Sequence, residues 1–176
     1  MKLRVGSLNR KRERGISLLE TVVAAGLMIV GIGGVMSLFT VGASKNMSQG
    51  TQASRCTEYA QDKMEQLMAL SFSDTVSNTT VIPTAATGGV GLTPGGSVYP
   101  NTFTANYVDY VTEGTGSSAA IFTTLQSNSA YERQWSIVSN ATDSNIVTIT
   151  VTVQSLQSVD RGAAPLTTLV SMKTNF

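Results

Sequence analysis

The sequence predicts an α+β protein in which a long N-terminal α-helix packs, through its second half, on a small antiparallel β-sheet. A run without any charged residue extends from Thr21 to Ser44. A helical spacing of apolar residues then continues past Lys45 to about Leu70, and the C-terminal part changes to the two-residue alternation of β-strands. The sheet is therefore expected to cover the apolar side of the second half of the helix.

The first half of this helix, residues 16–44, is predicted to span a membrane. A helix over residues 16–43 would be about 42 Å long, and the hydrocarbon core of a bilayer is about 30 Å thick. A secretory signal peptide is the alternative, but its apolar region is about 7–15 residues, which is shorter than this run. Basic residues before the helix predict a cytoplasmic N-terminus and a single-pass topology.

The charges of the chain are concentrated at its beginning. Six of the 12 basic residues lie within the first 14 positions, together with one acid, Glu13. The remainder holds 12 − 6 = 6 basic and 11 − 1 = 10 acidic residues, a formal charge of −4. Residues 1–15 therefore form a basic segment in front of a mildly acidic body. The six basic residues are Lys2, Arg4, Arg10, Lys11, Arg12 and Arg14.

Several kinds of chemistry are excluded by composition. The chain has no histidine and a single cysteine, Cys56, so an intramolecular disulfide, histidine base catalysis and an ordinary zinc site are ruled out. No nucleophile–base pair, metal-ligand cluster or phosphate-binding loop is found either. We therefore expect a protein that is not an enzyme and that needs no cofactor or metal.

The second half of the helix, residues 45–70, is predicted to be amphipathic. Apolar residues recur there at steps of three and four, and charged residues such as Glu58, Asp62 and Lys63 are expected on the opposite, solvated side. Cys56 is expected to be a small buried apolar residue of this stripe. The predicted stripe consists of Ala53, Cys56, Ala60, Met64 and Leu67.

Residues 71–176 are predicted to form a β-rich globular domain. Eight glycines and prolines within residues 83–100 indicate a long loop. Three later segments alternate like strands, around Trp135 and Ile137, over residues 145–154, and around Val170 and Met172. We expect an antiparallel meander whose apolar face packs on the helix stripe, and a further short strand over residues 107–111.

The most informative motif is the string from Arg14 to Glu20, which reads RGISLLE and is followed by the apolar run. Gly15 has no Cβ, so its backbone fits closely into a peptidase cleft at the membrane face. Glu20 is unusual, because a carboxylate in a spanning helix costs about 2.5–3.5 kcal/mol on insertion scales. Cleavage after Gly15 would create an α-amino group on Ile16, with which the Glu20 of a neighbouring subunit could pair.

This string resembles the N-terminus of type IV prepilins and pseudopilins over roughly residues 10–45. The resemblance implies recognition of the basic leader, including Lys11, Arg12 and Arg14, by a membrane prepilin peptidase. The peptidase would cut between Gly15 and Ile16 and methylate the new N-terminus.

For the mature protein, the resemblance implies a pilin-like fold and a place in a filament. An inner-membrane assembly platform and its ATPase would move the subunit from the membrane into a periplasmic or cell-surface filament with other pilin or pseudopilin subunits. Glu20 would act between subunits. The Leu-Leu-Glu form looks most like the minor, PilV-type branch or the related minor pseudopilins of type II secretion. Many major pilins begin with Phe and carry a helix-kinking proline in the membrane half, where this chain has Ile16 and Ser37, so a major-pilin role is not expected.

Three function classes follow. The first is a minor subunit of a type IV pilus, with a minor pseudopilin of type II secretion as its alternative. The second is a DNA-uptake or adhesive pilin. This reading is less favoured because DNA binding needs a basic surface and residues 71–176 hold only three cations, Arg133, Arg161 and Lys173. The third, a membrane-tethered enzyme, lacks any supporting motif.

Overall fold

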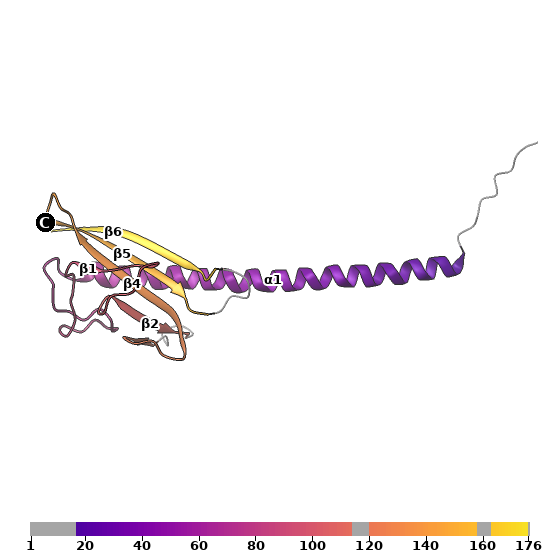
Figure 1. The fold of residues 1–176 in the computed structure, drawn as a ribbon, viewed down its shortest axis with the longest axis horizontal. Coiled ribbons are helices and arrows are strands. Elements are labelled where there is room, and N and C mark those ends of the chain that lie inside the picture. Colours follow the sequence, from indigo (N-terminus) through magenta and orange to yellow (C-terminus); the bar gives the residue numbers. More distant parts are fainter. Residues whose placement is uncertain (1–16, 114–119, 158–162, 176) are drawn as a thin grey trace, which may run out of the picture. The chain divides into compact units, whose positions relative to one another are not determined.

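The structure is a computed structural model that describes residues 17–113, 120–157 and 163–175. Contacts divide the chain into two compact units, Met1–Lys45 and Asn46–Phe176, and each is described by itself. Helix α1, Leu18–Ala69, contributes its first part to the first unit and its last part to the second (Figure 1). The prediction of one continuous helix over residues 16–70 is therefore confirmed over nearly its whole length.

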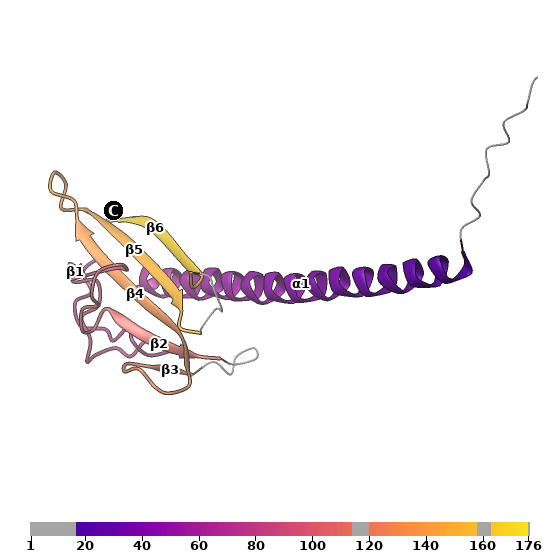
Figure 2. The ribbon, with the colours of Figure 1, turned by 45° about the vertical axis from the view of Figure 1, so that its right-hand side comes forward.

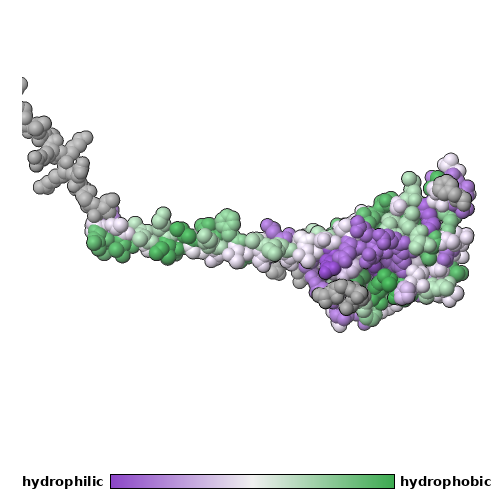
Figure 3. Space-filling view, turned by 180° about the vertical axis from the view of Figure 1, so that it is seen from behind, coloured by the Kyte–Doolittle hydropathy of each residue, from purple (hydrophilic) through white to green (hydrophobic). Residues whose placement is uncertain are grey.

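In the first unit, every described residue is exposed. The surface of this part of α1 is mostly apolar (Figure 3), and α1 is long and apolar enough to cross a membrane by length and composition. Three of its hydroxyl side chains, those of Thr21, Ser37 and Thr40, donate to carbonyl groups four residues earlier. The hydroxyl of Ser37 donates to the carbonyl of Gly33 at 2.9 Å, and that of Thr40 to the carbonyl of Met36 at 2.9 Å. These bonds lower the cost of placing hydroxyl groups in an apolar medium.

The second unit is built on one antiparallel sheet with the strand order β3-β2-β4-β5-β6, and a short β1 that also pairs with β4 (Figure 2). The predicted β4-β5-β6 meander is confirmed, as is the short strand near Tyr107. Two strands were not predicted, β1 and β3, and each has only two residues. The strands are β1 Gly95–Gly96, β2 Val108–Thr112, β3 Ile121–Phe122, β4 Ser129–Ser139, β5 Ile146–Ser155 and β6 Leu166–Thr174.

The glycine-rich loop places β1 directly on β4. Gly96 has a positive φ of 82°, and a Cβ there would lie 2.2 Å from the backbone oxygen of Trp135. Only glycine allows both this conformation and this approach. The loop was correctly predicted, but its pairing with the sheet was not.

The core lies between the sheet and the second half of α1. Trp135 and Ile137 of β4 are buried, as are the alternating valines and isoleucine of β5. The predicted helix stripe is partly correct. Cys56, Ala60 and Leu67 are buried, whereas Ala53 is exposed and Met64 is only partly buried. Three buried residues of α1 were not predicted to belong to the stripe: Gln52, Tyr59 and Lys63.

The prediction for the last strand, β6, is wrong about which face is buried. Val170 and Met172 are 63% and 68% exposed and lie on the outer face. Register with β5 places Leu169 opposite the buried Val151. Lys173 therefore also lies on the inner side, where its ammonium group donates to the carbonyls of Met68 and Leu70 at the end of α1. These two bonds satisfy carbonyl groups at the end of α1 that have no hydrogen-bond donor within the helix.

Because the sheet covers the stripe of α1, the second unit should fold without the apolar half of the helix. A fragment of residues 46–176 should be a soluble monomer with a strand signal by circular dichroism. Analytical ultracentrifugation would test this. A fragment that aggregates strongly, or that shows no strand signal, would contradict the architecture.

Candidate functional site

The first candidate site is the exposed apolar part of α1 around Glu20. Glu20 lies in the first turn of the helix, where a carboxylate interacts favourably with the helix dipole. Within the described part of the chain, Glu20 has no ion-pair partner. The first turn is closed by Thr21, whose amide and hydroxyl both bond the carbonyl of Ser17. A single carboxylate is thus presented on an otherwise apolar helix surface.

The other predicted site residues of the N-terminus lie outside the described residues. These are the leader cations Lys11, Arg12 and Arg14 and the two residues of the cleavage site, Gly15 and Ile16. Their assignments remain predictions from the sequence.

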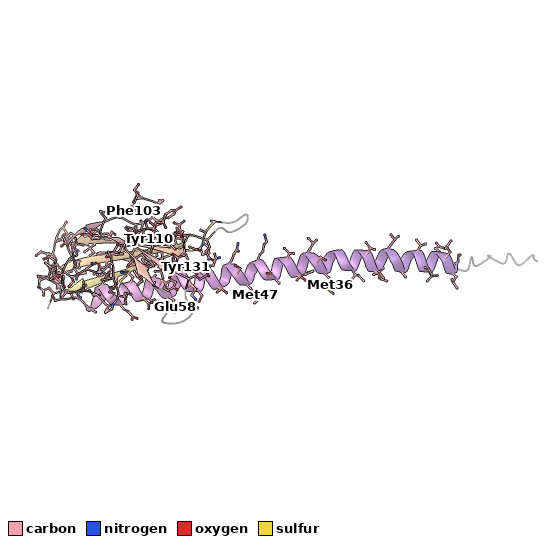
Figure 4. The ribbon with its side chains drawn as sticks, turned by 90° about the horizontal axis from the view of Figure 1, so that it is seen from below. Met36, Met47, Glu58, Phe103, Tyr110 and Tyr131 are labelled. Carbon is pink, nitrogen blue, oxygen red and sulfur yellow. The ribbon has the colours of Figure 1, made fainter. Side chains whose placement is uncertain are left out.

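The apolar side chains of this helix have nothing to pack on within their own unit. Met36 projects from this part of α1 and is 64% exposed (Figure 4). A Cβ at Gly26, Gly31 or Gly34 would have open space around it. Burying apolar surface is worth about 25 cal/mol per Å², so this exposed surface favours contact with an apolar environment, and the helix is long and apolar enough to cross a membrane. Small residues would let such helices approach closely.

A second notable feature is a buried cluster of charges between α1 and the sheet. Asp109 on β2 and Arg133 on β4 face each other in the strand register. The carboxylate of Asp109 accepts from Nε of Arg133 at 2.6 Å and from Nη2 at 2.9 Å. Lys63 of α1 completes the cluster, with Nζ 2.7 Å from Oδ2 of Asp109. All three side chains are fully buried, so two cations share one carboxylate.

The position of Lys63 corrects the expectation that it lies on the solvated face. Its ammonium group also donates to Oε1 of Gln66 at 2.6 Å and to the carbonyl of Thr79, and it lies 4.4 Å from the centre of the Trp135 ring. Burial lowers the pKa of Lys63 to about 8, although the charge of Asp109 opposes the shift. The cluster ties α1, the following loop and two strands together.

Cys56 behaves as predicted, as a small buried apolar side chain. Its Sγ lies 3.5 Å from the carbonyl oxygen of Pro165, and burial raises the pKa of the thiol to about 11. A thiol with a raised pKa is a poor nucleophile at neutral pH. Cys56 is therefore a core residue.

The lowered pKa of Lys63 predicts an unusual dependence of stability on pH. Above pH 8 the folded unit releases the Lys63 proton, whereas the unfolded chain keeps it up to about 10.5. Since the unfolded state then binds more protons, stability should rise with pH. The limiting slope is about 1.4 kcal/mol per pH unit. The raised pKa of Cys56 has the opposite sign above pH 9, so the rise is cleanest between pH 8 and 9.

Denaturant unfolding of the 46–176 fragment at pH 7.5, 8.5 and 9 would measure this slope. Lys63→Met removes this titrating group, so its slope over the same range should be much smaller, with the lowered pKa of Lys173 still favouring a slight rise. A wild-type slope that is flat, or a slope that Lys63→Met retains, would contradict the placement of Lys63 as a buried, charged side chain.

Comparison with family models, with curated proteins and with solved structures finds no match to this chain.

Proposed function

We propose that the chain is a minor structural subunit of a type IV pilus-like filament, made as a precursor and assembled through its N-terminal helix. The observation that carries the proposal is the described part of the helix around Glu20. It has an apolar surface that is exposed along its whole length and one carboxylate in its first turn. This arrangement follows directly after the basic leader and the Gly15–Ile16 step of the sequence.

The apolar helix holds the precursor in the inner membrane, with the basic leader in the cytoplasm. A prepilin peptidase removes residues 1–15 and methylates the amino group of Ile16. An assembly platform driven by an ATPase then moves the subunit into the filament, where the lipid around the helix is replaced by neighbouring helices. The Glu20 carboxylate pairs with the amino group of a neighbour, so that neither charge is left alone in the apolar filament core.

The second unit supports a structural role with no nucleic acid as partner. Two of the three cations after residue 70 are engaged within the unit, Arg133 with Asp109 and Lys173 with the end of α1. DNA binding relies on cations that face phosphates at the surface. Arg133 belongs to the buried ion-pair cluster of the core, and Lys173 is bonded to the end of α1. These two residues therefore form no exposed basic patch. The folded unit is therefore proposed as the part of the subunit that lies on the outside of the filament.

Processing tests the proposal in a simple way. Co-expression with a prepilin peptidase should shorten the wild-type chain by 15 residues, whereas Gly15→Arg should stay full length because a long charged side chain blocks close approach of the backbone. Intact mass of the membrane fraction gives the result, with a catalytically inactive peptidase as control. A wild-type chain that keeps its full length with active peptidase would contradict the proposal.

A further inference from the structure

The two strands at the ends of the sheet in the second unit differ greatly in length (Figure 2). One end is β3, which has two residues, and the other is β6, Leu166–Thr174, which has nine. Every residue of β6 pairs with β5 in one unbroken register. No strand among the described residues pairs with the other side of β6. An edge strand of this length presents a row of unpaired backbone groups to any extended chain beside it.

The hydrogen bonds at the two ends of the β5-β6 pair show which residues of β6 present these groups. The amide of Ser155 donates to the carbonyl of Pro165 at 3.0 Å, and the amide of Asn175 donates to the carbonyl of Asn145 at 2.9 Å. Opposite residues of antiparallel strands exchange backbone bonds at every second position. The odd-numbered residues of β6 therefore bond to β5, and the N–H and C=O groups of the even-numbered residues face the free edge. The even-numbered residues are Leu166, Thr168, Val170, Met172 and Thr174.

Strand β6 lacks the features that usually protect an edge strand from pairing. It contains no proline and no bulge, and its single charged residue, Lys173, is bonded to the end of α1 on the inner side. The side chains of Val170 and Met172 are exposed on the outer face, next to the free edge. Val138 of β4, 58% exposed, lies on the same face, in one row with Thr148 and Met172. These groups match an extended backbone that carries apolar side chains at alternate positions.

We propose that β6 is a docking edge for an extended, uncharged segment of another protein chain, which adds to the sheet as one more antiparallel strand. Every strand pair of the described sheet is antiparallel, and this arrangement continues it. Residues of the segment that exchange bonds with the even-numbered residues of β6 place their side chains on the outer face, beside Val170 and Met172. Backbone bonds supply the affinity, and the apolar outer face selects the side chains. The segment is assigned to a different chain because the second unit is expected to be monomeric.

The probe is a fluorescent peptide of alternating threonine and valine, with lysines only at its ends, titrated into the full-length protein in detergent micelles. Anisotropy should show saturable binding with a Kd below about 1 mM, over a background measured with empty micelles. Two methylated peptides are the matched controls. N-methylation of the valines, which lie on the outer face in the proposed pairing, removes the donors that face β6 and should abolish binding. N-methylation of the threonines places the methyl groups on the far edge and should leave binding within about twofold. Absence of saturable binding, or equal binding of the two methylated peptides, overturns the proposal.

Two variants of one residue locate the binding on the protein. Val170→Pro removes an N–H group that faces the free edge and is not needed for pairing with β5, so it should keep the fold and weaken peptide binding about tenfold. Val170→Thr keeps the N–H group and the branched shape, and should bind the peptide within about twofold of the wild type. If Val170→Pro binds the peptide like the wild type, β6 is not the docking edge. If Val170→Pro fails to fold, by circular dichroism, the two methylated peptides still decide. Wild-type dimers that form without peptide and that Val170→Pro dissociates would assign the edge to a second copy, against the proposal.

Discussion

Asp109→Asn should destabilise the folded unit by about 3–5 kcal/mol, which is the usual cost of leaving a buried charge without its partner. The change removes the single carboxylate that Lys63 and Arg133 share, at a site where all three side chains are fully buried. It also replaces one carboxylate oxygen, a hydrogen-bond acceptor, with an amide NH₂ group, a donor, which faces the donors of Lys63 and Arg133. Since a domain of this size has only about 5–15 kcal/mol of stability in total, the loss should be readily measured.

The measurement is thermal and urea unfolding of the 46–176 fragment. For about 130 residues, the expected loss corresponds to a fall in Tm of roughly 10–20 °C. Asp143→Asn is the matched control, because it makes the same chemical change in an exposed turn between β4 and β5 and should cost less than about 0.5 kcal/mol. An Asp109→Asn variant that unfolds like this control would show that the cluster does not hold the helix to the sheet.

This cluster also shows where prediction from the sequence reaches its limit. Lys63 follows a helical pattern in which a lysine is most simply placed in solvent. Its partners lie 46 and 70 positions further along the chain, on two different strands. Nothing in the local spacing connects them. Only the strand register, which sets Asp109 opposite Arg133, and the packing of α1 bring the three charges together.

Elements with a strong local pattern were predicted well. The alternation of residues 145–154 predicted β5, with Val147 and Ile149 buried. In β6 the same period gave the wrong face, because apolar residues occur on both sides of that strand. The face of β6 that is buried is set by the register with β5 and by the bond from Lys173 to the end of α1. Both are tertiary contacts, which a local sequence pattern does not contain. The motif around Gly15 and Glu20 was found from the sequence alone, and its role remains a proposal.

Glu20→Gln should reduce the amount of the protein in filaments at least tenfold while leaving processing and membrane insertion intact. In the proposed assembly, loss of the carboxylate leaves the amino group of a neighbouring Ile16 unpaired in an apolar core, at a cost of about 3–5 kcal/mol. A cost of 1.4 kcal/mol already corresponds to a factor of ten in an equilibrium. The folded unit should be unaffected, because Glu20 makes no ion pair within the described chain.

Filaments sheared from cells and the corresponding membranes would be compared by quantitative mass spectrometry. Thr21→Val is the matched control, since it changes the neighbouring residue and removes a hydroxyl that bonds only the carbonyl of Ser17. Its abundance in filaments should match the wild type. Equal abundance of Glu20→Gln and the wild type, with normal processing, would contradict a pairing role for Glu20.

If the mature chain is a filament subunit, sheared filaments should contain its N-terminal peptide. We expect a chain of 176 − 15 = 161 residues that begins with methylated Ile16, at a small fraction of the main subunit. A protein that is found only in membranes, at full length and never in the filament fraction, would contradict it.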